Sequence, residues 1–355
     1  METTGPPHPP AATAGSARLE RLRRSSSFRG GVFVNAEPAV FAAPGKVLGL
    51  AGEWFAARGL TRPKAPLPSV PLRRAAFDSP PADDVRLTWM GHSTVLIELE
   101  GCRLLCDPIW SDRASPARFA GPRRFQPAPL PLGELPDLDA VVVSHDHYDH
   151  LDKATVQAIA QQQPRVPFIV PLGVGAHFER FGIASDRVIE LDLWEEQAVA
   201  SGALRLVASP TRHFSGRGVR DRDRTLWVSW ALVGRRHRVF FGGDGGYGKS
   251  FAEVGRRLGP FDVTLLEIGA HHPAWGTIHL GPENALVAHA DLSGQLLLPI
   301  HWGAFNLAIH PWDEPIEKLF ETASASGARV ALPRLGEQVL ASAPPGPTPW
   351  WRAAG

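Results

Sequence analysis

The sequence predicts an α/β fold in which two β-sheets lie between layers of helices. From Val85 onward, short apolar runs of strand length are bounded by Gly, Pro and Asp. A turn at Glu100-Gly101 joins two of these runs and predicts antiparallel strands. Stretches of helical character separate several later runs, and such helices need sheet faces to cover. Two sheets sandwiched between helices satisfy all three observations.

The expected elements follow the chain in a mixed order. We expect strands at residues 86–90, 94–98, 103–106, 140–143, 167–170, 204–208, 226–233, 238–241, 263–268, 296–300 and 329–332. We expect helices at 153–161, 251–258, 282–291 and 315–324. A chain of 355 residues is long enough to bury the core of one large domain. We therefore expect a single catalytic domain.

The N-terminal residues differ in composition from the remainder of the chain. They are rich in Pro, Ala, Gly and Arg, so that little of this stretch can fold alone. We divide the chain into an N-terminal Pro/Arg-rich extension at 1–80, a catalytic domain at 81–345 and a C-terminal tail at 346–355. The extension is expected to be partly disordered or membrane-facing, with one helix at 47–58. Its arginines fit a solvated tail, or alternatively a patch that contacts anionic lipid.

Charge and cysteine content narrow the partners and the compartment. The chain has 37 basic and 36 acidic residues, a net charge of +1, which argues against a nucleic-acid partner. The two cysteines, Cys102 and Cys106, lie ~13 Å apart in an extended strand, beyond disulfide reach. No apolar stretch is long enough to cross a membrane. We expect a cytoplasmic protein. Peripheral contact with the inner membrane surface is left open, as is the formation of a homodimer.

A cluster of potential metal ligands follows one predicted strand. His145, His147, Asp149 and His150 fall within six positions, between the apolar run 140–143 and a predicted helix. In such a loop, alternate residues such as His145 and His147 can converge on one cation, while Asp149 and His150 turn to a second. Imidazole and carboxylate groups suit zinc. The spacing therefore predicts a metal site.

Three further residues of ligand type end apolar runs in the same way. These residues are His213, Asp244 and His301. Glycine pairs flank Asp244 and remove side-chain bulk where the backbone would approach the metals. Taken singly, each of the three has a simpler interpretation, as a turn, loop or core residue. Together they predict the remaining ligands.

The motifs resemble those of a known family. HxHxDH at 145–150 is similar to the metal motif of the metallo-β-lactamase superfamily, which implies a four-layer αββα sandwich. Within it, the chain resembles the N-acylphosphatidylethanolamine phospholipase D branch. WMGHSTVLIEL at 89–99, DPIWSDRASPARFAGPRRF at 107–125 and ELPDLDAVVVSHDHYDHLD at 134–152 carry this resemblance. It extends over about 85–340.

The resemblance implies two Zn²⁺ per chain and a role for each site residue. It implies that His145, His147 and His213 bind one zinc ion, that Asp149, His150 and His301 bind the other, and that Asp244 bridges them. Tyr148 and His279 would contact substrate. Asp149 and Asp107 are expected to act in catalysis, Asp107 as an outer partner of a ligand or of a metal-bound water.

The implied activity is a zinc-dependent phosphodiesterase of phospholipase D type. Its substrate would be an N-acylphosphatidylethanolamine-like phospholipid, cleaved to phosphatidic acid and an N-acylethanolamine. One alternative is a lactonase or phosphoesterase that acts on a soluble metabolite. Alternatives from other classes are a diiron redox protein and a non-catalytic membrane-associated binder. A harder iron site would favour a carboxylate in place of His147.

Overall fold

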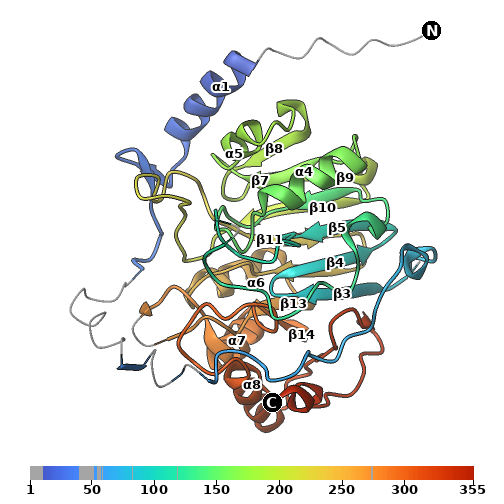
Figure 1. Cartoon of the computed structure of the whole chain (residues 1–355). Coiled ribbons are helices and arrows are strands. Elements are labelled where there is room, and N and C mark those ends of the chain that lie inside the picture. Colours follow the sequence, from blue (N-terminus) through green and yellow to red (C-terminus); the bar gives the residue numbers. More distant parts are fainter. Residues whose placement is uncertain are drawn as a thin grey trace.

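Two packed β-sheets form the centre of the molecule (Figure 1). The computed structural model describes residues 11–39, 52–53, 57, 59–81, 83–117, 119–272 and 275–355. The strands of the first sheet are β3 (Val85–Gly91), β4 (Thr94–Leu99), β5 (Cys102–Cys106), β6 (Ala140–Val142), β7 (Phe168–Pro171), β8 (Val188–Leu191) and β15 (Gln338–Leu340). Those of the second sheet are β9 (Glu196–Val199), β10 (Leu204–Ser209), β11 (Ser229–Val233), β12 (Arg238–Phe241), β13 (Phe261–Glu267) and β14 (Gly294–Ile300).

Both sheets combine an antiparallel half with a parallel half. Their strand orders are β15-β3-β4-β5-β6-β7-β8 and β14-β13-β12-β11-β10-β9. Strands β3, β4 and β5 pair antiparallel, as the turn at Glu100-Gly101 predicted, whereas β5 to β8 and β12 to β14 pair parallel. Parallel neighbours require crossover connections. Because they run in the same direction, their carboxyl ends gather at one edge of each sheet.

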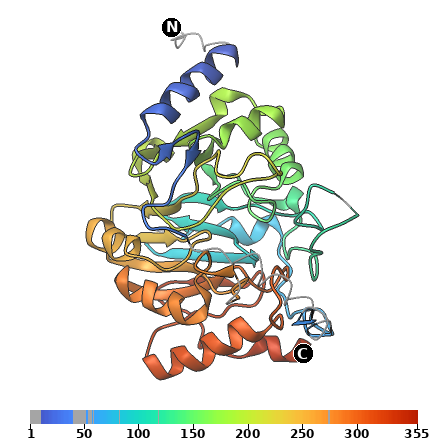
Figure 2. The same cartoon turned by 90° about the vertical axis from the view of Figure 1, so that its left-hand side faces the viewer.

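Helices cover the outer face of each sheet. They are α4 (Lys153–Gln162) and α5 (Gly175–Arg180) on the first sheet, and α6 (Ser250–Leu258), α7 (Gly281–Asp291) and α8 (Glu314–Ser326) on the side of the second. Side chains alternate along β4, where Val95 and Ile97 join the core between the sheets and Leu96 joins the core under α4. Figure 2 shows the green helices on one side of the sheets and the orange helices on the other. The predicted four-layer αββα sandwich is confirmed.

The chain ends also contribute to this core. Helix α1 (Ala11–Arg24) leads into a short hairpin of β1 (Phe28–Arg29) and β2 (Val32–Phe33). Phe33 and Trp351 are both buried in the large core cluster, which extends from the space between the sheets to the helices over the second sheet. The helix predicted at 47–58 falls largely on residues outside those described. Among the described residues, no helix has the length and apolarity needed to cross a bilayer.

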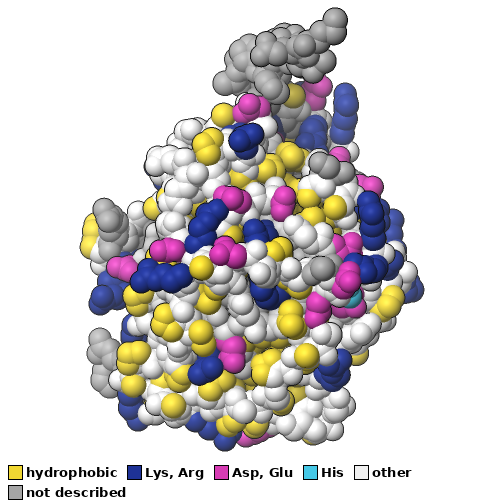
Figure 3. Space-filling view, turned by 90° about the vertical axis from the view of Figure 1, so that its right-hand side faces the viewer, with side chains coloured by type: hydrophobic (Ala, Val, Ile, Leu, Met, Phe, Trp, Pro, Cys, Tyr) yellow, Lys and Arg dark blue, Asp and Glu magenta, His cyan; other side chains and the backbone are white. Residues whose placement is uncertain are grey.

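Some elements differ from the sequence prediction. The strand predicted at 329–332 is wrong, because Val330 forms only a single bridge with Leu297. The strand predicted at 226–233 begins at Ser229. Cys102 and Cys106 are both free, as expected from their spacing in β5. On the face shown in Figure 3, basic and acidic side chains are intermixed, in keeping with the net charge of +1.

Candidate metal centre

The predicted ligands lie at strand ends, on loops that follow both sheets. The loop from Ser144 to Asp152 connects β6 to α4 and carries His145, His147, Asp149 and His150. The Asp152 carboxylate accepts a hydrogen bond from Ala154 N and caps α4, which ends the loop. His213, Asp244 and His301 follow β10, β12 and β14 of the second sheet. The seven side chains meet at the edge where the two sheets face each other.

Three imidazoles form one group. His145 Nε2 lies 2.8 Å from His147 Nδ1, and His213 Nε2 lies 3.3 Å from the same atom. Burial lowers the pKa of His145 and His213 well below the ordinary histidine value, so both rings are neutral. Burial lowers the pKa of His147 as well. Three neutral nitrogens directed at one point match the ligand set of a metal cation.

A carboxylate and two imidazoles form the second group. Asp149 Oδ2 lies 3.3 Å from His150 Nε2 and 3.3 Å from His301 Nε2. Burial lowers the pKa of His301, but Asp244 and the hydrogen bond to Asp149 outweigh burial and raise it to about 10. The carboxylates therefore require positive charge beside them. A divalent cation can supply that charge in place of the protons.

Asp244 lies between the two groups. Its Oδ2 is 3.1 Å from both His150 Nε2 and His301 Nε2. The same atom is 4.0 Å from His145 Nε2 and 3.9 Å from His213 Nε2. One carboxylate oxygen is therefore within reach of cations held by either group.

The unpaired atoms of the cluster test whether a metal fits. Among the described residues, Asp244 Oδ1 is buried without a hydrogen-bond partner, and buried His150 Nε2 forms no hydrogen bond although the Asp149 and Asp244 carboxylates lie beside it. His213 Nδ1 bonds the carbonyl of Ile278 at 2.9 Å, and His150 Nδ1 lies 2.6 Å from Asp107 Oδ2. Each bond occupies the far nitrogen and leaves Nε2 for a metal. The donor set fits a divalent transition metal.

Asp107 lies behind the cluster, where it is fully buried. Besides His150, its carboxylate accepts hydrogen bonds from Ser144 N at 2.7 Å and Ser144 Oγ at 2.6 Å. The backbone of Asp107 has a φ of 41°, a left-handed conformation that this tight arrangement stabilises. This contact places Asp107 where it can orient His150, and its role in catalysis stays a prediction.

His279 lies beside the metal ligands. Its ring centroid is 5.3 Å from that of His213 and 5.5 Å from that of His301. Its Nδ1 bonds the buried Glu267 Oε2 at 2.7 Å. Glu267 was missed in the sequence analysis because it is the last residue of the apolar strand β13. Only the tertiary structure pairs it with His279.

Tyr148 contacts the loop that follows His213. Its hydroxyl donates to the carbonyl of Arg217 at 2.8 Å, and the Arg217 guanidinium lies 3.9 Å from the centre of its ring. Arg217 also donates to the carbonyls of Asp146 at 2.6 Å and Leu151 at 2.8 Å. Tyr148 is not among the side chains that line the cavity at the metal ligands. In this conformation it supports the ligand loop.

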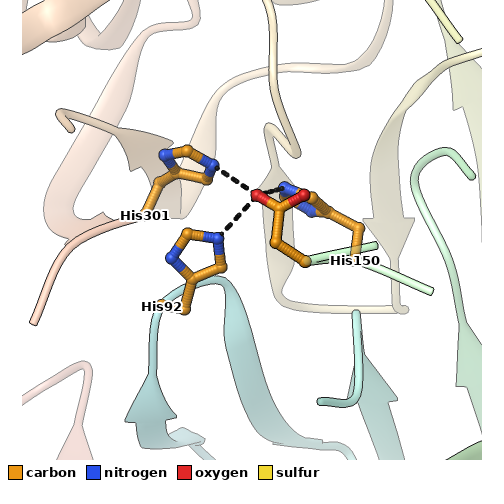
Figure 4. A group of neighbouring side chains, drawn as sticks. His92, His150 and His301 are labelled. Carbon is orange, nitrogen blue, oxygen red and sulfur yellow. Dashed lines mark hydrogen bonds and ion pairs between the residues drawn. The ribbon is translucent and has the colours of Figure 1, made fainter. Parts of the chain in front are cut away.

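His92 is a further member of the cluster that sequence reasoning missed. Figure 4 shows His92, His150 and His301 around one carboxylate, that of Asp149, and His92 Nε2 lies 2.9 Å from Asp149 Oδ2. Burial lowers the pKa of His92 to about 3, so that the neutral ring donates its proton to the carboxylate. His92 occupies the tight turn between β3 and β4, with a φ of 55°. Its place in the quoted WMGHSTVLIEL motif was the available signal.

A cavity of about 220 Å³ opens onto these residues. Metal ligands and His279 form one part of its wall, and apolar side chains form another. The apolar lining includes Phe214, Trp275, Ile278 and Leu307. The cavity can therefore hold a molecule with both a polar reacting group and an apolar portion.

An αββα sandwich with histidines and aspartates at its strand ends is typical of metal-dependent hydrolases. Residues 102–302 match the family model described as a beta-lactamase superfamily domain. The chain belongs to the metallo-β-lactamase superfamily.

Two relatives and one solved structure are similar to the chain. An uncharacterized protein of Mycobacterium tuberculosis is 46% identical over 350 residues, covering 97% of this chain and 92% of the relative. The N-acyl-phosphatidylethanolamine-hydrolyzing phospholipase D 1 of Caenorhabditis elegans is 40% identical over 248 residues, covering 67% of this chain and 69% of the relative. The chain thus matches that branch of the superfamily. A diiron β-hydroxylase from Streptomyces venezuelae shares the fold, with a TM-score of 0.55 and 19% identity over 73% of this chain and 54% of that one.

Proposed function

We propose that this chain is a dinuclear zinc phosphodiesterase of phospholipase D type that acts on N-acylphosphatidylethanolamine-like phospholipids. The observation that carries the proposal is the position of Asp244 Oδ2, 3.1 Å from two nitrogens of one ligand group and about 4 Å from two nitrogens of the other. A shared carboxylate of this kind suits a pair of cations. The C. elegans relative, named as a phospholipase D, supports the substrate class.

Each proposed zinc ion has its own ligands. His145, His147 and His213 would hold the first ion, Asp149, His150 and His301 the second, and Asp244 both. Two such ions, when bound, lower the pKa of water and neutralise charge on a phosphoryl oxygen. Around them, Asp107 fixes the tautomer of His150, and His92 donates to Asp149. These contacts keep the ligands oriented in the absence of substrate.

The cavity provides the proposed contacts to the phospholipid. Glu267 engages Nδ1 of His279 and leaves Nε2 as the atom that can contact the phosphodiester. Phe214, Trp275, Ile278 and Leu307 offer apolar surface to the hydrocarbon part of the same molecule. We also propose a cytoplasmic location with peripheral contact to the inner membrane surface, where such a substrate resides.

One experiment tests both the metals and the substrate. The purified protein is analysed for its metal content and incubated with vesicles of N-acylphosphatidylethanolamine, vesicles of phosphatidylcholine, a soluble phosphodiester and a lactone. We expect about two zinc per chain, and release of phosphatidic acid and N-acylethanolamine from the first substrate. Hydrolysis of only the soluble compounds would assign the site to a metabolite instead. Iron with a visible absorbance band would replace the hydrolase by a redox protein.

A further inference from the structure

The segment after α1 crosses the loop that carries His213. We call residues 25–37 the N-terminal strap. Figures 1 and 2 both show this blue segment alongside the yellow loops of the second sheet. The strap is fixed there by Phe33, whose side chain is buried in the main core and whose N–H donates to the carbonyl of Asp223 at 2.6 Å. Farther along, Glu37 Oε1 accepts a hydrogen bond from Lys249 N at 2.6 Å.

Between these two anchors, Asn35 pairs with both peptide groups of His213. Asn35 Oδ1 accepts from His213 N at 3.1 Å, and Asn35 Nδ2 donates to His213 O at 2.8 Å. Trp227 Nε1 also donates to Asn35 Oδ1, at 3.1 Å. The amide matches this pattern because it carries one acceptor and one donor on the same planar group.

The pairing fixes a residue of the three-imidazole group. Among the residues that the structure describes, Asn35 is the hydrogen-bond partner of both the N–H and the C=O of His213. The ring of His213 is held separately, through Nδ1 and the carbonyl of Ile278. Backbone and ring together determine where Nε2 lies relative to His145 and His147. The strap therefore supplies half of that constraint.

We propose that Asn35 is a positioning residue of the metal centre, so that the N-terminal strap is a working part of the three-histidine site. The proposal rests on the metal centre of the proposed function, and it concerns one of the two ions. Loss of the Asn35 amide frees the His213 peptide and widens the spread of positions that Nε2 adopts. Among the described residues, the side-chain hydrogen bonds of Asn35 go to His213 and Trp227 and not to Asp149, His150 or His301, so we expect that second group to keep its affinity.

The test is stepwise metal removal from the full-length, zinc-loaded protein with a chelator of graded concentration. The variants are Asn35→Ala, which removes the amide, and Asn35→Asp, which retains the acceptor but cannot donate to His213 O. Arg29→Gln is the matched control, because it alters an exposed side chain of the same strap that neither anchors the strap nor contacts His213. His213→Ala identifies which zinc equivalent belongs to the three-histidine group.

We expect both Asn35 variants to release the zinc ion of the three-histidine group at a chelator concentration ~10–100-fold lower than the parent does. The zinc ion of the second group should be released as in the parent. Arg29→Gln should release both zinc ions as the parent does. Equal retention of both ions by folded Asn35→Asp would overturn the proposal, as would equal weakening of both ions, or the same selective loss in Arg29→Gln. A parent that binds no metal would instead refute the proposed function, and the positioning role with it.

Discussion

Three imidazole rings surround one carboxylate oxygen of Asp149. A substitution that removes only the negative charge of this side chain therefore tests its role. We expect Asp149→Asn to abolish turnover, because the neutral amide cannot balance a cation beside His150 and His301. The loss should exceed the ~100-fold that removal of an outer partner of a metal site can cost. Steady-state hydrolysis of the preferred substrate measures it.

Metal content must be determined in the same preparation. Near-normal turnover by Asp149→Asn with both ions retained would remove Asp149 from the mechanism. The useful comparison is Glu20→Gln, a change on the exposed part of α1 that leaves the centre intact.

Among single residues, the sequence predicted those whose type and position are unusual for a purely structural role. His145, His147 and His150 are polar residues placed directly after an apolar strand, a pattern with few structural explanations. Glu267 and Asn35 carry no such pattern. Glu267 ends a buried strand, and Asn35 belongs to a segment whose composition predicted disorder. Their partners are brought together only by tertiary structure, which a local pattern does not record.

The turn after β12 packs more tightly than the sequence analysis anticipated. A Cβ on Gly246 would lie 1.7 Å from the carbonyl oxygen of Thr277, so backbone, and not only a metal, excludes a side chain there. We expect Gly246→Ala to lower the free energy of unfolding by about 1–3 kcal/mol, as overpacking does. Urea unfolding measures the change. Gly133→Ala, with nothing within 4 Å of its added Cβ, should stay within about 0.5 kcal/mol of the parent.

Helix α1 is attached to the domain through a partly buried arginine. Arg18 pairs with Glu179 and Glu190, each at 2.7 Å. We expect Arg18→Ala to weaken this attachment by about 1–2 kcal/mol, between the values for exposed and buried pairs. Limited proteolysis should then cleave α1 faster. Arg24→Ala removes only an exposed pair with Glu20 and should leave the cleavage rate unchanged.

The accuracy of the predicted elements follows their position in the sheets. Central strands such as β4 and β13 are continuous apolar runs, and their prediction was close. Edge strands have one free side and need less apolar sequence. The polar β9 (Glu196–Val199) was therefore missed. Conversely, the apolar run around Val330 packs into the core without extending the ladder, so its hydrophobicity alone suggested a strand.

For the whole molecule, we expect metal binding to be coupled to folding. A ligand that binds only the native state adds about 2.7 kcal/mol of stability at one hundred times its dissociation constant. We expect chelation of both ions to lower the thermal midpoint by roughly 5–10 °C, and added zinc to restore it. Calorimetry of the chelated and reloaded protein checks this. A double variant, His145→Ala with His301→Ala, should show a midpoint that is indifferent to chelator.

The seven predicted ligands are divided between the two sheets, four on the loop after β6 and three after β10, β12 and β14. Neither half of the polypeptide carries the complete set of predicted ligands. During synthesis, the amino-terminal half emerges with an unfinished set of donors, which gains its counterpart only when the second half has docked. We therefore expect complete loading of the proposed ions to come late in maturation, after the two halves have assembled.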